Sequence, residues 1–198
     1  MGRTLDFWFD FASTYSYLAA MRIEDAAAAR GALVRWRPFL LGPIFAAQGW
    51  TTSPFNLYPA KGRNMWRDLE RQTARMGLEL VRPDPFPQPS LAAARAALAV
   101  ADADRPRFSR AVFAAEFGDG RPIGEPATLI AVADGLGLDG AAIATATQTP
   151  AVKERLRSEV EEAQRLGLVG APSFVTPDGE LFWGNDRLEA ALDWLQES

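Results

Sequence analysis

The chain has 198 residues, of which 48% are hydrophobic and 23% are charged, and its formal net charge is −4. It contains no cysteine and no histidine, which excludes disulfides, thiol nucleophiles, His-based triads and the commonest zinc sites, so we expect no metal. The negative balance argues against bulk attraction to nucleic acid or to an anionic membrane. What remains is hydroxyl, carboxylate, amine and guanidinium chemistry, or a reactive group that a ligand brings.

Chain length and the amino-terminal region predict a cytoplasmic protein with one main core. A chain this long buries roughly 70% of the surface that its unfolded form exposes, which suits one compact domain or a core with one large insertion. No stretch reaches the roughly eighteen apolar residues that a membrane-spanning helix needs. Asp6 and Asp10 interrupt the apolar residues near the amino terminus, so we expect no secretory leader.

The first forty residues predict a βαβ unit. Residues 5–11 read LDFWFDF and alternate apolar and other side chains, which is the period of a strand. After Ser13 the apolar spacing becomes helical and continues to a stop at Gly31, and residues 33–41 predict a second strand. Ser13 therefore lies where the first strand passes into the first helix.

The middle of the chain predicts helices joined by proline-rich connections. Residues 82–89 contain four prolines and predict a stiff linker. Helical patterns with proline or glycine at suitable ends predict helices at residues 59–76, 90–103 and 105–117, and two more that begin at Pro126 and Pro150.

The last thirty residues return to strand patterns. Residues 174–176 and 181–183 flank the turn Pro177-Asp178-Gly179 and predict a β-hairpin. Asp186 and Glu189 have capping-box spacing and predict the start of a closing helix. The order βαβ, helices, ββα predicts an α/β fold: a thioredoxin-like core of residues 1–42 and 167–198, with an inserted helical domain of residues 43–166.

Four local sequences resemble the 2-hydroxychromene-2-carboxylate isomerase family, which is also grouped with kappa-class glutathione transferases. They are FDFASTYSYLA at 9–19, YPAKGRNMWRDLER at 58–71, VGAPSF at 169–174 and WGNDRL at 183–188. The resemblance implies a DsbA-like architecture, glutathione as cofactor, a small aromatic or electrophilic substrate and a homodimer. One departure is Thr14, where the family usually has proline; we expect a modest loosening of the turn.

Ser13 is the candidate catalytic and cofactor-binding residue. Dithiol oxidoreductases of this architecture begin the first helix with C-x-x-C, and residues 13–16 here read STYS. The protein would keep a thiolate-stabilising place without its own thiolate, and the resemblance implies that glutathione brings the sulfur. A Ser13 hydrogen bond of roughly 1.5–3 kcal/mol and a helix terminus of ~0.3–2 kcal/mol would lower a thiol pKa by about one to three units. The alternative is a simple helix N-cap, a common role of serine.

The resemblance implies further glutathione contacts. Pro172 would be cis, and the backbone of Val169 or Ala171 would pair with the cysteinyl part of glutathione. Asn185, Asp186 and Arg187 lie just past the hairpin, and Asp186 and Arg187 would hold the γ-glutamyl end. The alternative is that Asp186 only caps the last helix and that Arg187 is solvated.

The insert would supply the opposite wall. Lys61 matches a lysine of the family and would meet the glycyl carboxylate or an anionic substrate, and Asn56 is a further contact by position. Trp66 and Trp50 would line an aromatic pocket, or would belong to the core.

For these residues the resemblance implies a glutathione-dependent isomerase of aromatic-compound degradation. One alternative is a glutathione transferase that conjugates or reduces electrophiles. Another is a non-catalytic thioredoxin-fold binding module. Loss of free glutathione with a model electrophile would favour the transferase, and a chain with no affinity for glutathione would favour the module.

Overall fold

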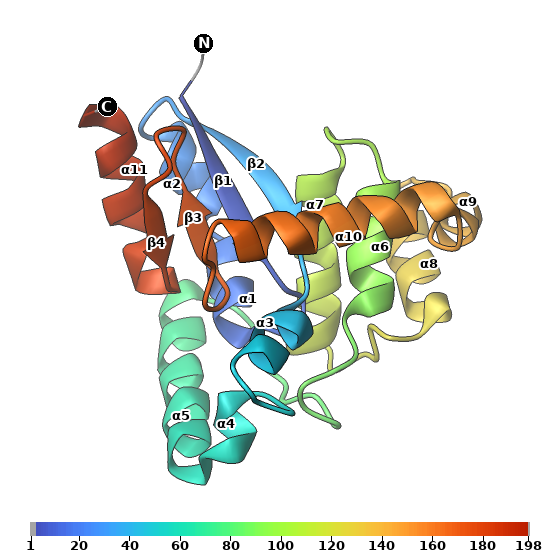
Figure 1. Ribbon diagram of the computed structural model, residues 1–198. Coiled ribbons are helices and arrows are strands. Elements are labelled where there is room, and N and C mark those ends of the chain that lie inside the picture. The colour runs from blue at the N-terminus through green and yellow to red at the C-terminus, as the bar shows by residue number, and fades with distance from the viewer. Residues whose placement is uncertain (1–2, 198) are drawn as a thin grey trace.

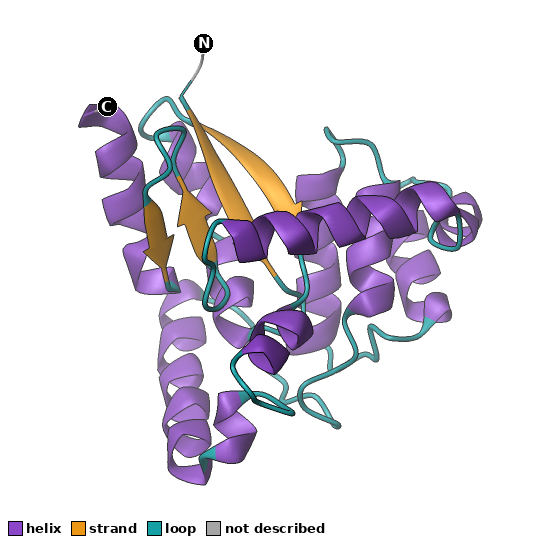
Figure 2. Ribbon diagram, in the orientation of Figure 1, coloured by secondary structure: helices purple, strands orange, loops and turns teal. Residues whose placement is uncertain are grey.

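The computed structural model describes residues 3–197 as a four-stranded sheet with helices on both faces (Figures 1 and 2). The strand order is β2-β1-β3-β4. β1 (Thr4–Phe9) pairs with β2 (Leu33–Pro38) in parallel, β3 (Ser173–Val175) is antiparallel to β1, and β4 (Leu181–Trp183) is antiparallel to β3. The predicted α/β class and hairpin are therefore confirmed.

The remaining elements are helical. In chain order they are α1 (Thr14–Ala20), α2 (Ile23–Ala28), α3 (Leu41–Ala47), α4 (Pro54–Leu57), α5 (Pro59–Met76), α6 (Leu91–Ala99), α7 (Arg105–Phe113), the π-helical η1 (Ala114–Gly118), α8 (Pro126–Gly135), α9 (Gly140–Ala146), α10 (Pro150–Arg165), the 3₁₀ turn η2 (Asn185–Arg187) and α11 (Leu188–Glu197). Among the described residues, no helix is both long and apolar enough to cross a membrane.

The alternation in β1 divides the core between the two faces of the sheet. Phe7 and Phe9 lie in the main core, which includes residues of α1, α2, α7 and α11. Trp8 points to the other face and joins a second cluster that includes Ala163 of α10. Each fully buried aromatic side chain of this kind contributes roughly 1.5–3 kcal/mol through removal of apolar surface from water. α10 crosses the second face in Figure 1.

The helices between β2 and β3 form two groups in space. α4 and α5 extend away from the end of the sheet, whereas α6 to α9 gather beyond β2 (Figure 1). The predicted boundary between residues 42 and 43 falls inside α3. The division into core and insert stays a prediction.

Two predicted elements end earlier in the structure than the sequence pattern indicates. The helix expected up to Gly31 breaks at Arg22, whose guanidinium group bonds the side chain of Asn185 at 3.1 Å. The strand expected at 33–41 ends at Pro38, because the Leu41 amide donates to the Asp10 carboxylate at 2.7 Å and begins α3. In both cases a partner distant in sequence overrides the local pattern.

Helices α4 and α9 were not expected from the sequence pattern. α4 is a single turn, capped by the Ser53 hydroxyl. α9 begins after Asp139, whose carboxylate accepts from the Ala142 amide at 2.8 Å. That Asp-Gly start was a readable N-cap signal.

Candidate functional site

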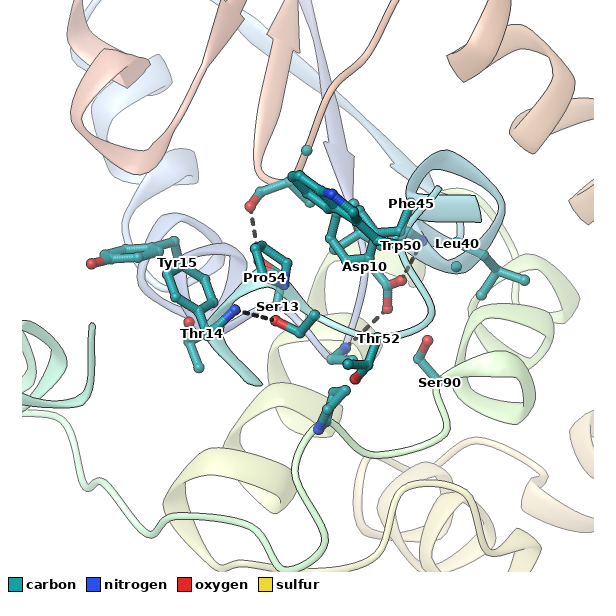
Figure 3. A pocket seen from close by; sticks show the side chains of 18 of the residues that line it. Asp10, Ser13, Thr14, Tyr15, Leu40, Phe45, Trp50, Thr52, Pro54 and Ser90 are labelled. Atoms are coloured by element: carbon teal, nitrogen blue, oxygen red, sulfur yellow. Dashed lines mark hydrogen bonds between the residues drawn. The ribbon is translucent and has the colours of Figure 1, made fainter. Parts of the chain in front are cut away.

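A cavity of about 1180 Å³ opens where β1 ends and α1 begins. Its lining comes from the loop after β1, from α3 to α5 and their connections, from the proline-rich linker, and from residues 169–171 and 183–186. Figure 3 shows Asp10, Ser13, Tyr15 and Ser90 around it. Ligand pockets in proteins commonly span roughly 300–1,000 Å³ with a few convergent polar groups, so this cavity has room for a tripeptide together with a small substrate.

Ser13 lies at the base of the cavity and caps α1. Its hydroxyl oxygen accepts from the Ser16 amide at 3.2 Å and its O–H donates to the Ala171 carbonyl at 2.9 Å. The side chain is only 8% exposed. Ser13 can therefore be both the N-cap of α1 and a residue of the site. The cap uses the hydroxyl oxygen as an acceptor and leaves the hydroxyl proton for another partner.

Asp10 lies beside Ser13 and organises two walls. Its carboxylate accepts from the Ala12 amide at 3.0 Å and from the Leu41 amide at 2.7 Å. Burial raises the pKa of Asp10, although the two amides and the Ser90 hydroxyl act in the opposite direction. The sequence analysis did not single out this residue as part of the site. Its position immediately after an apolar strand was the feature of the sequence that could have indicated a site residue.

A hydrogen-bonded row extends from α1 across α5 to the turn after β4. The Tyr15 hydroxyl donates to Asp68 at 3.0 Å, Gln72 donates to the same carboxylate at 2.6 Å, and Asn185 donates to Gln72 at 3.1 Å. Burial and the bond to Asp68 raise the pKa of Tyr15. Burial alone would raise the pKa of Asp68, but the bonds from Tyr15, Gln72 and Arg71 outweigh it and lower that pKa. This row holds one end of the cavity in place.

Six of the predicted glutathione-binding residues line the cavity: Ser13, Lys61, Val169, Ala171, Asn185 and Asp186. The Lys61 ammonium lies 4.6 Å from the centre of the Tyr58 ring and has no ion pair with a carboxylate among residues 3–197. The Asn185 side chain is engaged at both ends, by Gln72 and Arg22, so it positions the turn.

The turn after β4 differs from the predicted capping box. Asn185, Asp186 and Arg187 form a 3₁₀ turn, and the Asp186 carboxylate lies 3.3 Å from the Arg187 guanidinium. Glu189 pairs with Arg22 instead of reaching back to the turn. The closing helix α11 begins at Leu188, within the predicted segment, but the part of the capping box assigned to Glu189 is wrong, and Arg187 does not line the cavity.

Pro172 lies next to the cavity, and the Ala171–Pro172 bond is cis, as the resemblance implies. Pro172 itself does not line the cavity; the preceding residues 169–171 do. Two further X–Pro bonds are cis, before Pro85 and Pro87 in the linker.

Asn56 and Trp66 lie elsewhere. They line a second, smaller hollow of about 500 Å³ on the far side of α5. Asn56 donates to the Phe86 carbonyl at 3.0 Å, and the Trp66 ring packs edge-on against Phe86 at 4.9 Å. Their prediction as substrate contacts of the main cavity is not supported by this arrangement, because the connection between α3 and α4 covers that wall instead. Trp50, from this connection, does line the main cavity.

The residues of the cavity fit glutathione. The Ser13 hydroxyl can turn from a carbonyl acceptor to a sulfur, and the exposed carboxylate of Asp186 suits an ammonium group. Lys61 supplies a cation for a carboxylate. The backbone at Val169 lies at the cavity wall beside the cis proline. These groups come from both parts of the chain and face one space.

This fold and this site define a thioredoxin-like protein whose redox cysteines are replaced by hydroxyl residues. The profile of the DsbA-like thioredoxin domain family matches residues 4–196. A 2-hydroxychromene-2-carboxylate isomerase of Sphingobium xenophagum is 32% identical over 196 residues, which cover 98% of this chain and 99% of the relative. Human glutathione S-transferase kappa 1 is 27% identical, with 98% and 92% of the two chains covered.

Solved structures agree with these relatives. A 2-hydroxychromene-2-carboxylate isomerase superposes with a TM-score of 0.85 at 29% identity, covering 97% of this chain and 95% of that chain. The cytosolic disulfide reductase DsbM from Pseudomonas aeruginosa with GSH has a TM-score of 0.67 at 19% identity, over 97% and 95% of the chains, and shares the fold. The chain belongs to the DsbA-like thioredoxin family, in the branch that includes 2-hydroxychromene-2-carboxylate isomerases and kappa-class glutathione transferases.

Proposed function

We propose that the protein is a glutathione-dependent isomerase of the 2-hydroxychromene-2-carboxylate type that acts in the degradation of aromatic compounds. The names of the relatives support the reaction class. The observation that carries the proposal is the Ser13 hydroxyl, which lies at the base of a large cavity with a proton to donate. With no histidine or cysteine in the chain, the nucleophile comes with the cofactor.

The chain's own residues bind and orient in this proposal. Asp186 meets the amine of the γ-glutamyl end, Arg187 assists from outside the cavity, and Lys61 meets the glycyl carboxylate or the substrate anion. The backbone of Val169 or Ala171 pairs with the cysteinyl part. Ser13 turns its O–H from the Ala171 carbonyl toward the sulfur and favours its charged form. When bound, glutathione supplies a thiol that adds to and leaves an unsaturated carbon, which frees a double bond to rotate.

Ser13→Ala tests the proposal. We expect glutathione-dependent isomerisation to fall by more than tenfold, because the charge-assisted hydrogen bond to sulfur is worth about 1.5–3 kcal/mol. The fold should survive with about 1 kcal/mol less stability from the lost cap, which circular dichroism and thermal unfolding would show. Ser16→Ala is a matched control, since its buried hydroxyl has no partner among the described residues and does not line the cavity. Unchanged turnover of Ser13→Ala at neutral pH would remove Ser13 from the mechanism.

A glutathione transferase is the second candidate, favoured by the human kappa-class relative. Both activities use the same thiol site, but a transferase consumes glutathione and an isomerase returns it. Free glutathione measured before and after complete turnover separates them. A cytoplasmic location and a homodimer stay predictions.

A further inference from the structure

Glu116 is a buried acid that the proposed function does not use. It lies in the π-helical segment η1, is 0% exposed, and neither carboxylate oxygen has a hydrogen-bond partner among residues 3–197. π-helical turns inside α-helices often occur at functional sites. An ionised carboxylate without partners is very costly in such a place, and burial raises the pKa of Glu116 strongly.

Asp10 is the charged group that acts on Glu116. Asp10 is 3% exposed, lines the cavity, and has its two oxygens on the amides of Ala12 and Leu41. The neighbouring elements do not balance these acids with a cation. α3 carries no charged residue. Within the described chain no ion pair joins either acid to the guanidinium groups of α6 and α7, which are Arg95, Arg105, Arg107 and Arg110.

Asp10 already places one buried carboxylate, without an ion-pair partner among the described residues, at the cavity wall. Two carboxylates in one desolvated region do not both ionise, because each disfavours the charged form of the other. Asp10 precedes Ser13 by one turn, and its backbone carbonyl oxygen accepts a hydrogen bond from the Ser13 amide. A thiolate beside Ser13 would therefore place a second negative charge next to Asp10. A thiol that lost its proton to water would leave two adjacent buried anions. A thiol that passes the proton to Asp10 leaves one.

We propose that Asp10 accepts the proton of the thiol that enters the cavity. The S–H bond breaks, an O–H bond forms at a carboxylate oxygen of Asp10, and the electron pair stays on sulfur. The negative charge moves from Asp10 to the sulfur and the total charge is unchanged. Asp10 then donates this O–H to the sulfur, beside Ser13. The proposal rests on the proposed binding of glutathione as a thiolate.

Two measurements on the full-length protein test it. Titration calorimetry with glutathione at neutral pH, in buffers of different ionisation enthalpy, gives the protons released to buffer per glutathione bound. Ultraviolet difference absorbance gives the thiolate formed. We expect thiolate to form in the natural protein with about zero protons released, and Asp10→Asn to release about one proton for each thiolate. S-methylglutathione, which has no thiol, should release none with either protein.

Each other outcome has a distinct meaning. About one proton released per thiolate in the natural protein overturns the role of Asp10 and leaves glutathione binding intact. Absence of binding or of thiolate overturns the proposed function. Glu116→Gln is the matched control and should keep the number of protons released per thiolate formed near zero. A ratio that rises in Glu116→Gln and not in Asp10→Asn would make Glu116 the acceptor and contradict the proposal.

Discussion

The two ends of β1 carry carboxylates with opposite surroundings. Asp6, near its beginning, accepts from Arg35 at 2.6 Å and lies 3.3 Å from Arg37. Arg37 also pairs with Glu159 of α10 and lies over the Trp8 ring at 4.2 Å. Asp10, just past the end of the strand, has hydrogen bonds from two amides and a hydroxyl, and no described residue forms an ion pair with it.

The register of the sheet explains the contrast. Asp6 lies opposite Arg35 in the parallel pair, whereas β1 ends with Phe9 opposite Pro38. Arginines on β2 therefore balance the first acid, and nothing comparable reaches the second. The ion-paired carboxylate of Asp6 supports the sheet, whereas the carboxylate of Asp10 lies at the cavity without an ion-pair partner among the described residues. The same strand thus serves structure at one end and the site at the other.

The largest expected effect is the difference in turnover between variants at the two ends of β1. We expect Asp10→Asn to lower glutathione-dependent turnover by about hundredfold, in the range for loss of a general acid or base. Asp6→Asn should change turnover by less than about twofold, because its partners lie away from the cavity. Steady-state kinetics at saturating glutathione measure both. Equal losses in the two variants would erase the distinction.

In contrast to Asp10, Asp6 should act mainly on the stability of the fold. Asp6→Asn breaks the charge-assisted contacts of a mostly buried carboxylate with the exposed Arg35 and the largely buried Arg37, and we expect the free energy of unfolding to fall by about 1–3 kcal/mol. Urea unfolding followed by circular dichroism measures it. Arg67→Gln breaks an exposed pair with Glu70 and serves as control, with an expected loss below about 1 kcal/mol. If the free energy of unfolding falls by the same amount in both variants, Asp6 contributes no more to stability than an exposed ion pair does.

Glu116 should give the stability a pH dependence. Its pKa is raised in the folded chain by burial, so the folded state keeps a proton that the unfolded state loses above about pH 4.3. The free energy of unfolding then falls as pH rises, by about 1.4 kcal/mol per pH unit for one proton, until the raised pKa is passed. Glu116→Leu removes this slope, so its advantage over the natural protein should widen with pH in urea unfolding. Parallel curves would mean that Glu116 is ionised in the folded chain.

The rim of the cavity should give the smallest effect. A Cβ at Gly170 would lie 2.5 Å from Nε1 of Trp183, which is 57% exposed and free to shift. We therefore expect Gly170→Ala to raise the KM for glutathione by about threefold with kcat unchanged, the pattern of lost uniform binding. Trp66→Phe, in the second hollow, should leave the KM unchanged. A larger effect on kcat than on KM would place the rim in the chemistry.

Local patterns predicted the elements of the sheet and the position of Ser13. The alternation in residues 5–11 defined β1, and the turn Pro177-Asp178-Gly179 joined β3 to β4. The change from strand to helix spacing placed Ser13 at the start of α1, and the resemblance implied the cis bond before Pro172. The same reasoning missed Asp10, since its partners Leu41 and Ser90 are distant in sequence.

Errors occurred where distant side chains compete with a local rule. Asp186 has good spacing for a cap, but the Arg22 contacts with Asn185 and Glu189 shape that turn. Trp66 and Lys61 come from the same motif, but they lie on different faces of α5. Lys61 lines the main cavity and Trp66 lines the smaller hollow.

Composition and periodicity alone determined that this chain has no thiol or imidazole of its own, and that its strands and helices follow the thioredoxin order. Only the packed structure decided which acids lie near one another and which have a cation. The physical reason is that propensity and periodicity act over a few residues, whereas the cost of a buried charge depends on every group around it, from whatever part of the chain that group comes.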